Sequence, residues 1–194
     1  MYQGNFIMTM KTYDKILGSF FILATIVMIV IFFTNNRFFD WAFTRHQNIL
    51  SWYIRPLFTI PIVIGAFKKS YTIIFGSIFG LFTSMFWFPK PAVVSQTVKA
   101  FLEFEKGYLT TGWSIDKIFV VIAVILFFTF LICATWCRKW SWVFINIVVC
   151  TILKMGHSVI FGEGSGLSIV KPAILGVVIC TIAIWVFLKK RKAK

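Results

Sequence analysis

Two histidines and a few acidic residues are the side chains in this sequence best suited to acid-base or metal chemistry. They are His46, His157, Asp40, Glu105 and Glu163. A metal site needs three or four converging ligands, and none of these residues shows the H-x-x-x-H or H-E-x-x-H spacing of a helical zinc site. The chain also lacks the G-x-S-x-G motif of serine hydrolases. We therefore expect no metal and no cofactor, and the sequence favours a protein that is not an enzyme without excluding one.

Cation-proline dipeptides indicate a different chemistry. They are Arg55-Pro56, Lys90-Pro91 and Lys171-Pro172. Proline favours the first turn of a helix, so each cation is expected near the positive end of a helix dipole. A cation in that position is stabilised by an anion, and the three together predict an anion-binding site. The alternative is that all three side chains extend to lipid phosphates.

Glu105 is the acidic residue that the pattern ties to this site. In the segment 92–109, Val94, Val98 and Phe101 share one face of a helix, and Glu105 lies about 20° from Val94 on the same face. A carboxylate on an apolar face needs a partner, so we expect Glu105 to meet a cation or a histidine. The candidate ligand-binding residues are Arg55, Lys90, Glu105, His157, Lys171 and His46.

The elements that position these residues are expected to be helices in a membrane. Hydrophobic residues make up 59% of the chain and charged residues only 13%, which excludes a soluble globule. We predict an all-α, polytopic membrane protein with a single transmembrane domain, residues 1–194. Residues 92–109 are predicted to form an amphipathic helix in the interface. Six apolar runs are long enough to cross a bilayer, at approximately 16–33, 49–67, 71–88, 118–136, 141–159 and 172–188.

Two features of the second and third predicted spans bear on packing. Pro56 and Pro61 can each kink the second span, provided that other groups satisfy the freed backbone. Gly76 and Gly80 form a G-x-x-x-G pattern in the third span, which permits close helix-helix association.

The net charge of +14, from 20 Lys and Arg against 6 Asp and Glu, predicts the orientation. Basic residues gather in the short cytoplasmic loops of membrane proteins. Six spans put both chain ends on one side together with Lys68, Lys69, Arg138 and Lys139, and Asp14 is the only acid there. We expect a cell-membrane protein with cytoplasmic N- and C-termini. Nucleic acid is not an expected partner, because no soluble segment is long enough to form a basic surface.

Three functions remain open. The first is a transport or solute-binding component with an anion-binding site on the extracytoplasmic face, whose partners are the lipid bilayer and an anionic lipid headgroup or small anionic solute. In length and hydropathy the chain is similar to small six-helix subunits that capture substrate for vitamin transporters, which is an analogy of fold alone. The second is a membrane-embedded enzyme acting at the outer leaflet. The third is a non-catalytic interaction partner in the membrane.

Overall fold

The computed structural model describes residues 2–161 and 165–192, and every regular element in these ranges is a helix, which confirms the predicted all-α class. The α-helices are α1 (Tyr2–Thr34), α2 (Asn36–His46), α3 (Leu50–Leu57), α4 (Thr59–Lys68), α5 (Tyr71–Thr83), α6 (Gln96–Thr110), α7 (Ile115–Trp136), α8 (Trp140–Phe161) and α9 (Val170–Lys192). Two 3₁₀ turns, η1 (Ser84–Phe86) and η2 (Ser165–Ile169), follow α5 and precede α9.

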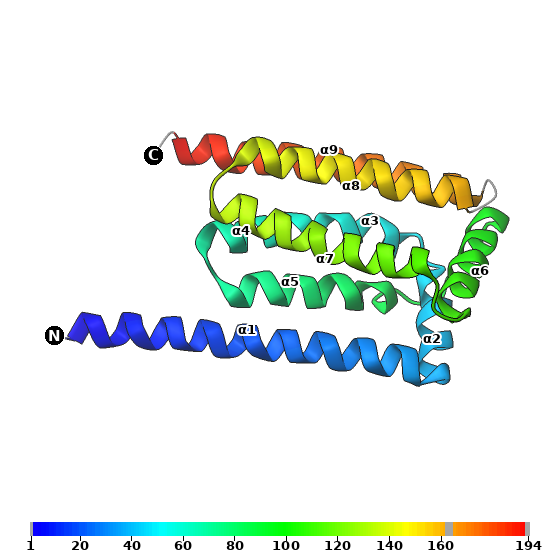
Figure 1. Ribbon diagram of the computed structural model, residues 1–194, viewed down its shortest axis with the longest axis horizontal. Helices are drawn as coiled ribbons and strands as arrows, with labels where there is room; N and C mark the ends of the chain where they lie inside the picture. The colour runs from blue at the N-terminus through cyan, green and yellow to red at the C-terminus, as the bar shows by residue number, and fades with distance from the viewer. Residues whose placement is uncertain (1, 162–164, 193–194) are drawn as a thin grey trace.

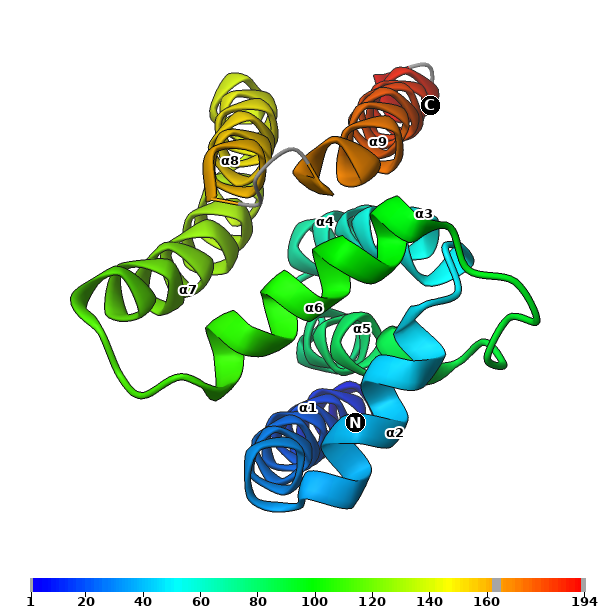
Figure 2. The ribbon, with the colours of Figure 1, turned by 90° about the vertical axis from the view of Figure 1, so that its right-hand side faces the viewer.

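Most helices run side by side along the long axis of the molecule, while α2 and α6 lie across one end (Figure 1). Helix α1 packs against α5, α5 against α4, and α4 against α7, whereas α3 and α8 pack against α9. Figure 2 looks onto the end that α2 and α6 cross, which we call the α6 end. Helix α1 begins and α9 finishes at the opposite end (Figure 1).

Five segments of the described residues are long and apolar enough to cross a membrane. This confirms the predicted class, a helical membrane protein. They are Met10–Thr34, Leu50–Lys68, Ile115–Trp136, Trp140–Ile160 and Gly166–Lys190. The third predicted span is shorter than expected, because the helical segment runs only from Tyr71 to Phe86. At about 1.5 Å per residue it extends about 24 Å, against about 30 Å for a hydrocarbon core. The predicted count of six spans therefore holds only approximately.

The second span bends at Phe58, between α3 and α4. Pro56 lies inside α3, in its last turn, so the expectation that Arg55 precedes a helix start is wrong. Arg55 instead lies near the negative end of the α3 dipole, where a cation is favoured. The Pro56 carbonyl accepts a hydrogen bond from the Cys180 thiol at 3.2 Å, which ties the bend to α9.

The chain between α5 and α6 is irregular, and side chains from the corner between α2 and α3 bind its carbonyl groups. Arg45 donates from Nε to the Phe86 carbonyl at 2.6 Å and from its terminal nitrogen to the Trp87 carbonyl at 3.3 Å. Asn48 donates to the Pro89 carbonyl at 3.0 Å. Irregular backbone persists at membrane depth only where the protein supplies such partners. The short α5 is therefore followed by a segment in which three carbonyl groups have side-chain donors.

Helix α6 covers its end of the bundle with an apolar face. It begins at Gln96, later than the predicted position 92, because the Ser95 side chain caps it by accepting from the Val98 amide at 3.3 Å. Val98, Phe101 and Leu102 are buried in one cluster with Trp52 of α3 and residues of α2. The predicted amphipathic helix thus folds back onto the ends of the long helices (Figure 2).

Candidate functional site

Four polar side chains from four helices come together at the α6 end. They are His46 at the end of α2, Arg55 on α3, Glu105 on α6 and Lys154 on α8, and we call them the Arg55 cluster. The charges of Arg55 and Lys154 act on His46, and the charge of Glu105 acts on both cations. Three of the four were candidates from the sequence, and Lys154 was not.

His46 is the most enclosed member of the cluster, with 3% of its surface exposed. Its Nδ1 lies 2.8 Å from the Ser51 hydroxyl, which itself donates to the Asn48 carbonyl at 2.7 Å. Because that hydroxyl proton is already used, Nδ1 carries the proton and donates to Ser51, leaving Nε2 as an acceptor. Burial, followed by the charges of Arg55 and Lys154, holds the pKa of His46 well below its ordinary 6.5. The ring is therefore a neutral acceptor in the folded protein.

Arg55 uses this acceptor and has capacity left over. One terminal nitrogen donates to His46 Nε2 at 3.4 Å. Over the described ranges this is the only hydrogen bond of the guanidinium, and the side chain is half-buried rather than sealed. A guanidinium has five N–H donors in a planar fork, so Arg55 can still offer donors to an anion.

Lys154 brings a second cation to the cluster from α8. The side chain keeps exposed surface, although the surrounding helices desolvate its ammonium group. Its charge acts on both His46 and Arg55. We infer an ammonium group that is drawn away from bulk water and still reachable by a ligand.

Glu105 is the acidic member, and it is half-buried on α6, as its place on the apolar face predicts. It acts on Arg55 and Lys154 from beyond ion-pair distance. Among the residues that the structure describes, the only ion pair joins Lys106 to Asp40, at 2.6 Å. Glu105 therefore offsets the two cations in part without occupying either of them.

One turn farther along both helices, Tyr108 of α6 meets His157 of α8. Their rings are perpendicular, with centroids 5.8 Å apart, and the Lys117 ammonium lies 5.1 Å from the centre of the Tyr108 ring. The Tyr108 hydroxyl is buried without a well-formed hydrogen bond to any described residue. Burial and the nearby Asp116 carboxylate raise the pKa of Tyr108 to about 12. Glu105 and Tyr108 share one face of α6, and Lys154 and His157 share one face of α8, because residues three apart are neighbours on a helix surface. These two faces are directed toward each other.

The remaining two candidates lie apart from the cluster. Lys90 is exposed in the irregular segment before α6, and Lys171 is exposed in the first turn of α9. Neither is among the charges that act on His46, Arg55 or Lys154. The structure therefore brings together Arg55, Glu105 and His46, with His157 beside them.

The arrangement offers charge recognition and shows little sign of catalysis. Ser51 is fully buried and its hydroxyl proton is directed to the Asn48 carbonyl, so the pair with His46 does not activate a nucleophile. A search of the described part of the chain finds no group of three or more metal-ligating side chains. Glu163, an acidic candidate from the sequence, lies outside the described residues.

Comparison with known proteins finds no match to this chain among protein-family models, curated protein sequences or solved structures. Any function must therefore be argued from the geometry and charge of the site.

Proposed function

We propose that this chain is a multi-pass protein of the cell membrane whose Arg55 cluster binds an anionic group, the phosphate or carboxylate of a small solute or of a lipid headgroup. The observation that carries the proposal is the charge balance of the cluster. Two cations, Arg55 and Lys154, act on each other, and the one acid that acts on them, Glu105, lies beyond ion-pair distance. An anion between the cations would offset a repulsion that is strengthened by their partial removal from water.

The members of the cluster would have distinct roles in binding. Arg55 supplies a planar fork that suits the two oxygens of a carboxylate or phosphate, and Lys154 supplies a point charge. His46 holds one edge of the guanidinium and, being neutral, adds no third positive charge. Glu105 would reduce the repulsion between Arg55 and Lys154 while the site is empty, and it would compete with the ligand for the same two cations.

We further propose that the site faces the extracytoplasmic side. The opposite end of the bundle carries Lys11, Lys15, Lys68, Lys69, Arg138, Lys139 and the basic tail against Asp14, which is the charge pattern of a cytoplasmic face. A site close to one end of the helices suits the capture of a solute or headgroup. This position favours a solute-binding or transport component. An enzyme of the outer leaflet is less favoured, because Ser51 and His46 are already hydrogen-bonded to each other.

Ligand-dependent stability of the purified protein tests the proposal. The protein in a neutral detergent would be heated with inorganic phosphate, glycerol 3-phosphate, succinate or short-chain phosphatidylglycerol, and with chloride at equal ionic strength. At ten times its Kd, a ligand that binds only the folded state adds about 1.4 kcal/mol and raises Tm by about 3 to 6 °C. Arg55→Gln and Lys154→Gln should each weaken this ligand at least about tenfold, since a hydrogen bond to a charged group contributes about 1.5 to 3 kcal/mol.

Matched variants separate this site from general attraction of anions. Lys99→Gln removes the same charge from the exposed face of α6 and should leave the affinity unchanged, as should Lys90→Gln and Lys171→Gln. Glu105→Gln should tighten binding, because it removes the competing carboxylate. The proposal fails if no anion stabilises the protein more than chloride, or if Lys99→Gln weakens binding as much as Arg55→Gln does.

A further inference from the structure

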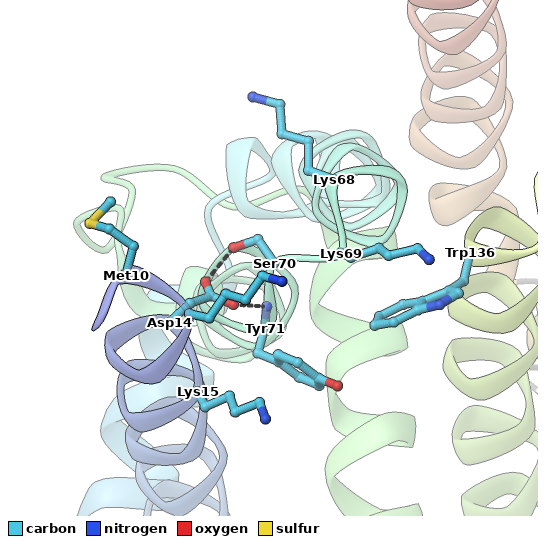
Figure 3. Close-up of a pocket in the computed structure, with 9 residues that line it drawn as sticks. Met10, Asp14, Lys15, Lys68, Lys69, Ser70, Tyr71 and Trp136 are labelled. Atoms are coloured by element: carbon cyan, nitrogen blue, oxygen red, sulfur yellow. Dashed lines mark hydrogen bonds between the residues drawn. The ribbon is translucent and has the colours of Figure 1, made fainter. Parts of the chain in front are cut away.

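A pocket lined by charged and polar side chains lies at the end of the bundle opposite α6. It has a volume of about 570 Å³ and is lined by the start of α1, the turn between α4 and α5, and the end of α7. Figure 3 shows this pocket, with Asp14 of α1 at its centre beside Ser70 and Tyr71. The turn itself contains Lys69 in the left-handed region, at φ 58°.

Asp14, the acid of this pocket, accepts three hydrogen bonds through its side chain from the start of α5. Its Oδ1 accepts from the Ser70 hydroxyl at 2.6 Å and from the Thr72 amide at 3.2 Å. Its Oδ2 accepts from the Tyr71 amide at 2.8 Å. The carboxylate thus satisfies the orphan amides at a helix start and joins α1 to α5. Within the described residues it makes no ion pair with the lysines around it.

Four lysines line the same pocket, and the structure records no ion pair for any of them within its described ranges. They are Lys11, Lys15, Lys68 and Lys69. The Lys69 ammonium lies 5.4 Å from the centre of the Trp136 ring, a cation-π contact that fixes its direction. In Figure 3 the Lys68 ammonium is directed away from the other labelled side chains, whereas Lys69 extends toward Trp136. Lys15 and Lys69 line the pocket from two different elements, α1 and the turn between α4 and α5, so this pair is suited to testing it.

We propose that this pocket binds the phosphate headgroup of an anionic phospholipid. Four lysines and one acid, Asp14, line the pocket, and none of these lysines makes an ion pair within the described residues, so the pocket carries an excess of positive charge. Tyr71 and Trp136 line it, and aromatic residues of this kind gather at headgroup depth. Basic pockets between helix ends on the cytoplasmic side are suited to lipid headgroups.

The face of α1 below Lys15 favours a lipid over free phosphate. At 100° per residue, Ile22 and Ile26 lie within about 20° of Lys15 on the helix surface. Both are exposed, Ile22 by 37% and Ile26 by 53%. A headgroup held at Lys15 therefore continues into an apolar strip along which acyl chains can lie. Free phosphate would gain nothing from that strip.

Lipid retention measured by native mass spectrometry tests the proposal. The protein in a neutral detergent would be titrated with dioleoyl phosphatidylglycerol, dioleoyl phosphatidylcholine or inorganic phosphate. We expect one phosphatidylglycerol to be retained in preference to phosphatidylcholine. The variant Lys15→Gln/Lys69→Gln should bind it about 30-fold more weakly, given the usual contribution of a lysine near an anionic lipid surface.

Two controls make the result decisive. Lys139→Gln/Lys190→Gln removes two exposed cations at the same end without touching the pocket, and should retain the lipid as the wild type does. Arg55→Gln should also retain it, which keeps this test independent of the site at the α6 end. Equal losses in the two double variants, no preference for phosphatidylglycerol, or saturation by inorganic phosphate at the same concentration would each overturn the proposal.

Discussion

His46 shows how one buried side chain determines the state of its neighbours. Its Nδ1 donates to Ser51 and its Nε2 accepts from Arg55, so both ring nitrogens are engaged only while the ring is neutral. A protonated ring would have two donors, and Nε2 would then face the Arg55 donor with a hydrogen of its own. The direction of the pKa shift agrees with this geometry, since burial and the two cations all disfavour the charged ring.

This geometry predicts that the protein loses stability in mild acid. Because the pKa of folded His46 lies well below 6.5, the unfolded chain takes up this proton first as the pH falls through 6.5. The free energy of unfolding is therefore unaffected by this proton above pH 6.5 and falls as the pH drops below it. The loss reaches about 2 kcal/mol at pH 5 if folded His46 is still neutral there. Thermal unfolding between pH 8 and pH 5 measures the loss. His46→Gln should flatten the profile. Parallel profiles for the wild type and His46→Gln would contradict the assignment.

The sequence pattern singled out Glu105 as a candidate and passed over Lys154. Glu105 was found because a carboxylate on an apolar helical face must turn inward to the protein. Lys154 lies in an apolar span, where any ionisable residue is a functional candidate, and it stands three residues before His157 on the same face. That signal was present in the sequence. The electrostatic interaction of Lys154 with Arg55 could not be read from the sequence, because it depends on how α3 and α8 are placed by α9.

Among the described helices, α1 and α5 share the most extensive contact, and a glycine outside the G-x-x-x-G pattern permits it. A Cβ added at Gly18 would lie 2.6 Å from the Cβ of Tyr71 and 3.0 Å from its backbone carbonyl carbon. A Cβ at Gly76 would lie 3.3 Å from the ring of Phe21, and one at Gly80 would lie 2.6 Å from the ring of Phe58. Both glycines of the pattern thus face rings of this same chain.

We therefore expect Gly18→Ala to be costly and Gly76→Ala to be tolerated. The methyl at position 18 would collide with atoms close to the α5 backbone, which cannot move alone, and overpacking of this kind costs about 1 to 3 kcal/mol. The methyl at position 76 meets a ring that can shift by a few tenths of an ångström, so the cost should stay below about 1 kcal/mol. Thermal unfolding of the two variants in one detergent compares them directly. A larger loss for Gly76→Ala than for Gly18→Ala would show that the α1–α5 contact is wrong.

The sequence predicted the order of the long helices but neither the short α2 nor where proline falls within a helix. The dipeptide Arg55-Pro56 suggested a helix start, whereas Pro56 lies in the last turn of α3 and the break follows at Phe58. A second proline, Pro61, lies close behind, and pattern alone does not say which of the two ends a helix. The length of α5 was also out of reach, because it depends on Arg45 and Asn48 binding the carbonyls that follow it.

The whole molecule separates charge between its two ends, and this was the part of the fold most readable from the sequence. In the part of the chain that the structure describes, one end carries cations with a single acid, Asp14, which accepts hydrogen bonds from two α5 amides. The α6 end carries both signs, including the ion pair of Lys106 with Asp40. The charges of the loops and the lengths of the apolar runs together indicate which loops lie at the same end of the bundle. They do not fix whether the short α5 carries the chain fully across the membrane.

The predicted topology can be measured with reporter fusions placed after Lys69, Arg138 and Lys194, which should all report the cytoplasm. A fusion after Trp113, in the exposed connection between α6 and α7, should report the opposite side. Lys69 is the decisive position, because a hairpin of α3, α4 and α5 that entered and left by the α6 side would change its signal alone. Arg138 and Lys194 would still report the cytoplasm in that case, since such a hairpin removes two crossings at once.

We expect a cytoplasmic signal at Lys69, because Lys68, Lys69, Lys11 and Lys15 share one pocket and four lysines at mid-membrane would be very costly. A signal at Lys69 that matches Trp113 would refute the six-crossing topology, and an extracytoplasmic tail would refute the orientation as a whole.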